Sequence, residues 1–252
     1  MSRSRREGRD RNGEGRGGEG RGGEPRDGEE RDRSGRRGYH HGNLREALIE
    51  AALELIAAKG TGGFTFAEAA RSAGVSPAAP YRHFRDRDAL LADVALQGFE
   101  RFGQALADAW DDGRPDPHTA FERLGRTYLA FARREPAYYS AMFESGLSLD
   151  DHPDLRQAGD RAFGIVRQAA EALAATLPAG RRPPAMMMAL HIWSVSHGIA
   201  SLFARGDAGR RRLPMSPEDL LEAALLIYLQ GLGLHWPGQA PDGSPDSPPR
   251  DG

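Results

Sequence analysis

Prolines divide a helix-patterned chain into separate segments, and this feature most limits what the chain can fold into. Between residue 44 and residue 234, apolar residues recur at intervals of three and four, as on one face of a helix. No stretch alternates with the period of two that a half-buried strand needs. Breaks are expected at the prolines, which interrupt helical hydrogen bonding. These are Pro115, Pro117, Pro136, Pro153, Pro178, Pro183, Pro184, Pro214 and Pro217. The sequence therefore predicts an all-α protein.

Capping signals set the expected helix ends. The first helix is expected to stop at Gly60, a residue type that favours helix termination. Thr65 can cap the second helix, because Glu68 follows three residues later in a capping-box pattern. Asp86 can cap a longer helix that runs past Phe102. Five further helices are expected near residues 118–134, 136–146, 152–177, 184–205 and 217–234.

The segment after Gly74 carries two prolines close together. Ser76 is expected to cap a helix there, with Pro77 at the first helical position, where its missing N–H costs nothing. Pro80 removes a helical hydrogen bond and biases Ala79 away from the α region. We therefore expect this helix to be short, bent or partly 3₁₀.

Residues 65–84 read as a helix, a glycine turn and a second helix, which is the helix-turn-helix arrangement. Small residues at the start of the second helix let the backbone approach base edges and suit thymine methyl groups. Aromatic and basic residues at its end can reach the flanking phosphates. Candidate DNA contacts are therefore Pro77, Ala78, Ala79, Tyr81, Arg82, His83 and, at the start of the next helix, Arg87. Phe64, Val75 and Phe84 are expected in the core, whereas Arg71 and Arg85 could contact phosphate or solvent.

Three stretches carry a family resemblance. "FTFAEAARSAGVSPAAPYRHFRDRDALL" resembles the DNA-binding domain of the TetR family of bacterial regulators, and "GYHHGNLREALIEAALELIAAKG" resembles its first helix. "HIWSVSHGIASLFARG" resembles the Trp-His-Gly helix in the C-terminal ligand domain of one large subset. The resemblance implies a three-helix helix-turn-helix domain followed by a helical ligand-binding and dimerisation domain. It also puts Thr65 among the DNA contacts. Arg87 matches a lysine of the family pattern, and Pro80 departs from the apolar residue usual at its position.

Four parts are expected along the chain. Residues 1–38 are expected to form an Arg/Gly/Glu tail that is too polar to bury a core, and residues 237–252 a second polar tail. Between them, residues 39–102 are expected to form the DNA-binding domain. Residues 103–236 are expected to form the ligand-binding and dimerisation domain. The run "GRGGEGRGGE" hints at RNA binding, but glutamates cancel most of its charge. Arg36, Arg37, His40 and His41 are better interpreted as a basic arm along DNA than as a metal site.

Aromatic and methionine residues on consecutive predicted helices indicate a ligand site between those helices. The candidates are Tyr128, Phe131, Tyr138, Met142, Phe143, Met187, Trp193 and His197, with His191 as a further polar group. None is a strong cation or a carboxylate, so we expect a small hydrophobic or aromatic effector. A filled core of the same composition is the alternative. The helix at 217–234 is apolar on most sides, so we expect it to pair with the helix at 184–205 across the two-fold axis of a homodimer.

Composition excludes several other classes of function. The chain has no cysteine, which excludes disulfides, cysteine zinc fingers and thiol nucleophiles. No nucleophile lies beside a base, and no phosphate loop or metal-ligand set occurs, so neither an enzyme, a cofactor nor a metal is expected. Leu220–Trp236 is the most apolar membrane candidate, but it is short and contains Glu222.

We predict a cytoplasmic transcriptional repressor bound to a palindromic double-stranded operator and released by its effector. A ligand-independent architectural DNA-binding protein is the alternative, and a helical enzyme is a weaker one.

Overall fold

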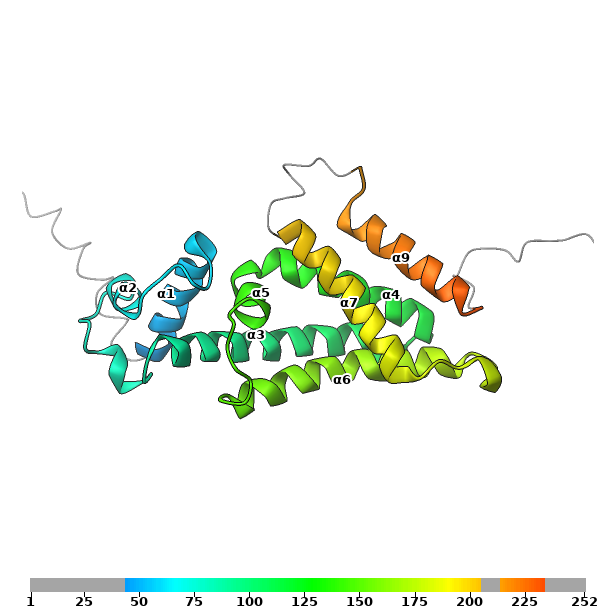
Figure 1. Ribbon diagram of the computed structural model, residues 1–252, viewed down its shortest axis with the longest axis horizontal. Coiled ribbons are helices and arrows are strands. Elements are labelled where there is room, and N and C mark those ends of the chain that lie inside the picture. Colours follow the sequence, from blue (N-terminus) through cyan, green and yellow to red (C-terminus); the bar gives the residue numbers. More distant parts are fainter. Residues whose placement is uncertain (1–43, 205–213, 234–252) are drawn as a thin grey trace, which may run out of the picture. The chain divides into compact units, whose positions relative to one another are not determined.

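The computed structural model describes residues 44–204 and 214–233, and these residues form helices and connecting loops without any strand (Figure 1). The α-helices are α1 (Leu44–Lys59), α2 (Phe66–Ser72), α3 (Arg87–Trp110), α4 (Pro117–Arg134), α5 (Pro136–Phe143), α6 (Pro153–Ala175), α7 (Ala185–Ala204) and α9 (Pro217–Gly231). Three 3₁₀ helices join them: η1 (Pro80–Arg82), η2 (Asp111–Gly113) and η3 (Ala179–Arg181). The all-α prediction is confirmed. The two expected tails and the basic arm lie outside the described residues.

Helix ends follow the predicted capping signals. Gly60, with φ of +76°, follows the last residue of α1, in a conformation that favours glycine. Thr65 and Glu68 form the capping box at the start of α2. The carboxylate of Asp86 accepts a hydrogen bond from the Ala89 N–H at 2.8 Å and caps α3. Local signals therefore set the end of α1 and the starts of α2 and α3.

The segment after Gly74 is shorter and less regular than a helix. Residues 76–79 form a turn in which the Ala79 N–H donates to the Ser76 carbonyl at 3.0 Å, so Ser76 does not cap an α-helix as expected. The 3₁₀ helix η1 begins at Pro80 and has three residues, which confirms the expected 3₁₀ character. The expected bias of Ala79 is wrong: its φ of −64° and ψ of −41° lie in the α region. Pro80 itself sits at the first position of η1, where its missing N–H leaves no helical hydrogen bond unmade.

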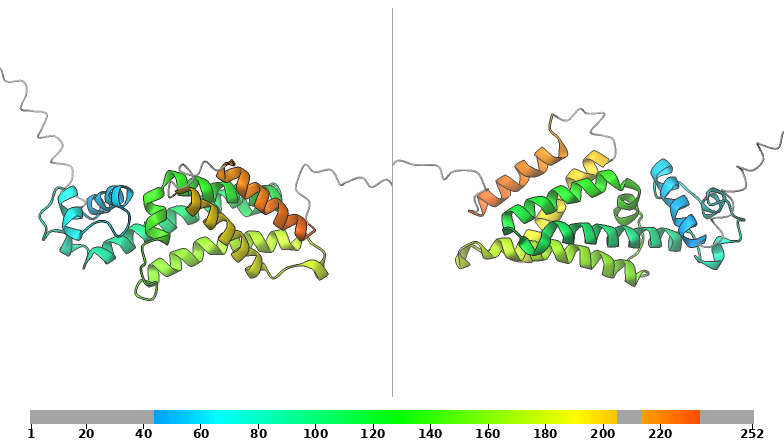
Figure 2. Two further views of the ribbon diagram at one scale, coloured as in Figure 1. Left: turned by 45° about the horizontal axis from the view of Figure 1, so that its top comes forward. Right: turned by 180° about the vertical axis from the view of Figure 1, so that it is seen from behind.

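The long helix α3 is in contact with more α-helices than α7 or α9. Helices α4, α5 and α6 contact α3, α7 lies on α4 and α6, and α9 lies on α4 and α7 (Figures 1 and 2). Helix α1 contacts α2, α3 and α5. The predicted domain boundary at residue 102 falls inside α3, so one continuous helix serves both predicted domains. A side chain at Gly98 would meet the Met142 sulfur at 2.8 Å, so glycine here allows α5 to approach α3 closely.

Helix α7 is the one described helix that is long and apolar enough to cross a membrane by length and composition. The window runs from Ala185 to Phe203, rather than over the segment that the sequence suggested, and a third of it is buried against other helices. Helices of soluble cores and of interfaces pass the same test, and α7 also carries His191, Ser196 and His197. The composition of α7 by itself therefore does not indicate a span.

Candidate nucleic-acid interface and aromatic cluster

The segment from Pro77 to His83 presents the predicted DNA contacts at the surface. Pro77, Ala78, Arg82 and His83 are exposed, and Tyr81 is 63% exposed. The Tyr81 ring meets the Phe66 ring edge to face, with centroids 5.1 Å apart. This contact fixes the first residues of α2 against η1, so the aromatic side chain stands at a defined place on the surface.

Buried residues hold the same segment on the protein core. Pro80 is buried, and its carbonyl accepts hydrogen bonds from the N–H groups of His83, at 2.9 Å, and of Phe84, at 3.0 Å. Phe84 and Phe64 are buried in the core, as predicted, and Val75 is partly buried. Pro80 therefore replaces the usual apolar residue as a core contact, although it prevents a longer helix.

Thr65 is exposed but already hydrogen-bonded. Its hydroxyl oxygen accepts a hydrogen bond from the Glu68 N–H at 3.2 Å, and its own N–H donates to the Glu68 carboxylate at 2.8 Å. Lys59 also donates to that carboxylate at 2.8 Å. The hydrogen bond from Lys59, and then those from Thr65, lower the pKa of Glu68 to about 2. A phosphate at Thr65 would therefore have to compete with Glu68.

Arg87 is engaged within the protein to a degree that the sequence did not indicate. Its guanidinium donates to the carbonyls of Phe64, at 3.0 Å, and of Thr61, and also to the carboxylate of Asp88, at 2.9 Å. The guanidinium carbon lies 4.8 Å from the centroid of the Phe64 ring. The side chain remains 27% exposed. Arg87 thus clamps the loop between α1 and α2 onto the start of α3, with a minority of its surface left for phosphate.

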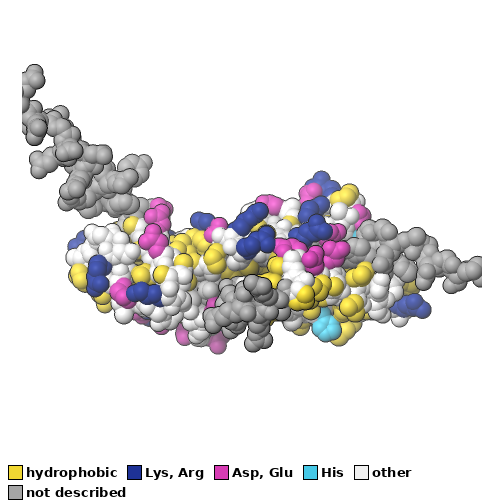
Figure 3. All heavy atoms as spheres, turned by 90° about the horizontal axis from the view of Figure 1, so that it is seen from above, with side chains coloured by type: hydrophobic (Ala, Val, Ile, Leu, Met, Phe, Trp, Pro, Cys, Tyr) yellow, Lys and Arg dark blue, Asp and Glu magenta, His cyan; other side chains and the backbone are white. Residues whose placement is uncertain are grey.

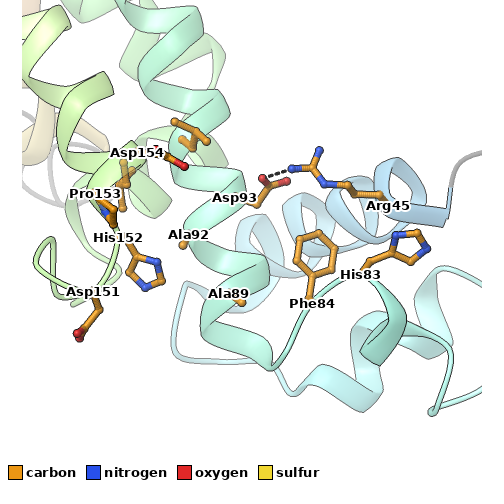
Figure 4. Close-up of a pocket in the computed structure, with 12 residues that line it drawn as sticks. Arg45, His83, Phe84, Ala89, Ala92, Asp93, Asp151, His152, Pro153 and Asp154 are labelled. Atoms are coloured by element: carbon orange, nitrogen blue, oxygen red, sulfur yellow. Dashed lines mark hydrogen bonds and ion pairs between the residues drawn. The ribbon is translucent and has the colours of Figure 1, made fainter.

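A pocket of about 350 Å³ lies between η1 and the start of α6 (Figure 4). Arg45 of α1 reaches across to the Asp93 carboxylate of α3, while His83 and His152 line opposite sides. Burial raises the pKa of Asp93, and the Arg45 guanidinium opposes that shift. The ion pair ties the first turn of α1 to α3. Since the lining carries charges of both signs, the pocket does not indicate one class of ligand.

Some of the predicted ligand residues lie together around the ring of Phe102, which is fully buried. Its centroid lies 5.0 Å from those of Tyr128 and Phe131 and 6.1 Å from that of Trp193. We call the following set the aromatic cluster: Phe99, Phe102, Tyr128, Phe131, Tyr139, Phe143, Phe163, Trp193 and His197. Helices α3, α4, α5, α6 and α7 all contribute to it. Edge-to-face contacts of this kind fix the rings relative to one another.

His197 gives this cluster a polar centre. Its Nδ1 atom lies 2.8 Å from the Tyr139 hydroxyl and 3.2 Å from the Tyr128 hydroxyl. Burial, and then the neighbouring Tyr139, raise the pKa of Tyr128, so this phenol stays protonated. Hydroxyl groups and an imidazole can exchange hydrogen bonds with a polar atom on an otherwise apolar compound.

Other predicted ligand residues lie elsewhere. Tyr138 and Met142 pack beside Gly98 at the contact between α5 and α3. Met187 is 50% exposed on the outer side of α7, away from the cluster, and His191 faces the Tyr228 ring. The sequence interpretation missed Tyr139, although helical spacing offered the signal: residues 139 and 143 lie one turn apart, whereas 138 and 142 share a different face. Phe99, Phe102 and Phe163 were missed because only the tertiary packing brings them into the cluster.

The outer sides of α7 and α9 expose large apolar side chains. They are Met186, Met187, Leu190, Val195, Leu202 and Ile227. An apolar hollow of about 270 Å³ opens between the two helices, and the space-filling view shows hydrophobic side chains on this side (Figure 3). Leu221, Leu225 and Leu229 instead form the buried stripe of α9. Within one chain, therefore, only one stripe of α9 is buried, and not most of its sides as predicted.

These features define a class of protein: a helix-turn-helix DNA-binding protein in which one long helix continues from the DNA-binding segment into the helical core. Comparisons give the family. Residues 48–94 match the sequence profile described as "Bacterial regulatory proteins, tetR family", and residues 121–228 match "Tetracyclin repressor-like, C-terminal domain". The chain belongs to the TetR family and is a DNA-binding transcriptional regulator.

Similar proteins extend over most of the chain. An uncharacterised helix-turn-helix transcriptional regulator of Bacillus subtilis (strain 168), YobS, is 25% identical over 198 residues, or 76% of this chain and 93% of that protein. A solved structure of unknown function from Rhodococcus sp. RHA1 is 30% identical, covers 77% of this chain and 98% of its own, and has a TM-score of 0.64. The TetR family regulator PfmR from Thermus thermophilus shares the fold at 20% identity, over 73% of this chain and 97% of its own, with a TM-score of 0.58.

Proposed function

We propose that this protein is a cytoplasmic, homodimeric repressor that leaves a palindromic operator when a small hydrophobic compound binds its aromatic cluster. The observation that carries the proposal is the continuity of α3. Arg87, its first residue, clamps the loop that precedes α2, and Phe102 of the same helix is the central ring of the cluster. A compound that moves Phe102 would therefore move a helix whose first residue holds the loop that precedes α2.

The proposed DNA contacts are the predicted ones, weighted by exposure. Tyr81, Arg82 and His83 have free surface for phosphates and groove edges, and the small Pro77 and Ala78 allow the backbone to approach the bases. Ala79 is half-buried, and Thr65 and Arg87 are tied to protein partners. We assign these three to secondary or supporting contacts.

The proposed dimer uses the outward apolar face of α7 and α9. Ile227 is 72% exposed and lines the same apolar hollow as Val195, and a contiguous exposed apolar patch of this kind is typical of an interaction site. Gly198 lies on the same side of α7, and a side chain there would meet nothing within 4 Å in its own chain, so a second copy could approach closely. Two copies joined in this way would present two DNA-binding segments, as half-sites roughly 34–36 Å apart require.

The proposed effector is uncharged and mainly hydrophobic or aromatic. Apolar rings make up most of the cluster, and His197 with its two tyrosine hydroxyls provides the polar contacts. For such a compound to act as a switch, it must bind one arrangement of α3 more tightly than another.

The test begins with DNA duplexes that the protein selects from a random pool. A panel of uncharged aromatic and aliphatic compounds is then screened by thermal shift, and each stabilising compound is assayed for DNA release by fluorescence anisotropy. We expect at least one compound to raise the melting temperature by mass action and to release DNA over the same concentration range. A Phe102→Ala variant should lose the response. Stabilising compounds that leave DNA bound would overturn the switch and favour a ligand-independent architectural role.

A further inference from the structure

Thr61, in the loop between α1 and α2, makes contacts in two directions. Its hydroxyl donates a hydrogen bond to the carbonyl of Glu144, at 3.0 Å and 83 residues away in the sequence. Its own carbonyl accepts a hydrogen bond from the Arg87 guanidinium. The residue is half-buried. One side chain and one peptide group therefore join the end of α5 to the start of α3.

The Glu144 carbonyl, which Thr61 contacts, lies next in the sequence to a ring of the aromatic cluster. Glu144 directly follows Phe143, the last residue of α5, and its N–H still donates to the Ser140 carbonyl at 2.8 Å. The Phe143 ring lies 4.8 Å from the ring of His197 and 6.0 Å from that of Trp193, centroid to centroid. The hydrogen bond from the Glu144 N–H holds Glu144 on the last turn of α5, so a displacement of this end of α5 together with Phe143 also moves the Glu144 carbonyl.

On its other side, the Thr61 loop positions the DNA-binding segment. Arg87 holds the carbonyls of both Thr61 and Phe64, and Thr65, the cap of α2, follows Phe64 directly. The Phe66 ring of α2 then supports Tyr81. A shift of the loop therefore changes where α2 and η1 stand relative to α3.

We infer that Thr61 is a positioning residue that couples the end of α5 to the DNA-binding segment, separately from the continuous helix α3. The inference rests on the proposed function, because it names the contact through which the cluster acts on DNA binding. The inferred role belongs to the hydroxyl group and is not required for packing. Thr61→Ser should therefore preserve the coupling, whereas Thr61→Val, which has nearly the same shape but no hydroxyl, should weaken it.

A double-mutant cycle tests this coupling without an effector. Phe143→Leu disturbs the cluster at a ring that contacts His197, and Thr61→Val removes the hydroxyl. The dissociation constant for a duplex selected by the wild-type protein is measured for Phe143→Leu, for Thr61→Val and Thr61→Ser, and for Phe143→Leu combined with each Thr61 variant. We expect Phe143→Leu to change this constant in the wild-type and Thr61→Ser backgrounds. In the Thr61→Val background the change should be smaller by about fivefold, the typical weight of one hydrogen bond.

A purely structural role would give independent effects. The inference is overturned if Phe143→Leu changes the dissociation constant by the same factor in the Thr61→Val and Thr61→Ser backgrounds. It is equally overturned if both Phe143→Leu and Phe143→Ala leave DNA binding unchanged. If Thr61→Val lowers the melting temperature beyond the DNA assay range, Thr61→Ala takes its place.

A distance measurement decides the question independently of DNA. The chain has no cysteine, so spin labels can be attached at Ser72→Cys in α2 and Gln168→Cys in α6, both exposed positions. Labelled protein is diluted into unlabelled protein so that pairs within one chain dominate. Thr61→Val should broaden the distance distribution, and Thr61→Ser should not. If the wild-type protein selects no duplex, the proposed function fails. The distance measurement still tests the positioning role in that case, and an unchanged distance distribution in Thr61→Val would overturn it.

Discussion

The hydroxyl of Tyr139 lies 2.8 Å from Nδ1 of His197 at the centre of a cluster that is otherwise built from hydrocarbon rings. Tyr139 is 1% exposed, so water cannot readily replace this hydrogen bond. A buried polar group that loses its partner is costly, and the pair therefore fixes how α5 and α7 face each other.

Tyr139→Phe should lower the free energy of unfolding by about 1 kcal/mol, because His197 Nδ1 then loses the shorter of its two hydrogen bonds to tyrosine hydroxyls. Chemical denaturation measures the loss. The matched control is Tyr138→Phe, one residue earlier, whose hydroxyl has only a 3.4 Å contact with Gln97. Equal losses in the two variants would contradict the special weight given to the His197 contact.

Arg82 and Arg87 should separate DNA contact from structural support. Arg82→Ala should weaken binding to all sequences and flatten the slope of log K against log salt by about 0.9, the value for one lost phosphate contact, at an unchanged melting temperature. Arg87→Ala should lower the melting temperature as well, since the Thr61 and Phe64 carbonyls lose their donor. Salt titrations of DNA binding and thermal melts check both. An Arg87 variant of wild-type stability would argue against the clamp.

Glu68 should make the stability of the DNA-binding segment depend on pH in the acidic range. Its pKa is lowered from 4.5 to about 2, so the folded state binds this proton less readily than the unfolded chain does. The stabilisation is therefore complete above about pH 4.5 and is lost as the pH falls towards 2. Melting temperatures from pH 7 to pH 2 should fall less steeply for Glu68→Gln than for the wild type. Glu171→Gln, in an exposed pair with Arg167, should retain the wild-type slope.

Ile227→Glu should weaken dimerisation without unfolding the chain. The side chain is 72% exposed in one chain, so a charge there is solvated until a second copy covers it. Sedimentation should show monomer and DNA affinity should drop, while Gln168→Glu, on the exposed side of α6, should leave both unchanged. Leu225, on the same helix, is not a suitable site for this test. Leu225 is 4% exposed and packs near Gly125 of α4, so its substitution would damage the fold instead. A stable dimer of Ile227→Glu would place the interface elsewhere.

The sequence predicted most of the fold because its signals are local. Thr65, Asp86 and the N-terminal prolines of α4 and α5 act within one helical turn of themselves, so helix ends could be placed without tertiary information. The turn before Pro80 was misjudged because its backbone depends on the burial of the proline ring.

The candidate site was harder to predict than the fold. Helix α5 is apolar on nearly all sides, so its composition did not reveal that Tyr139 faces the cluster while Tyr138 faces Gln97. The clamp formed by Arg87 joins residues 23 and 26 positions apart, and no local pattern signals such a contact. The outer and inner stripes of α7 became distinguishable only once α4 and α6 were in position.

The two prolines of the DNA-binding segment have a thermodynamic consequence. Proline fixes φ, so Pro77 and Pro80 narrow the range of conformations in the unfolded chain, and the Pro80 carbonyl then locks the turn through His83 and Phe84. A recognition surface that is ordered in advance loses little conformational entropy when its partner arrives. Association with DNA should therefore resemble rigid docking at this segment, without the large negative heat-capacity change that accompanies folding upon binding.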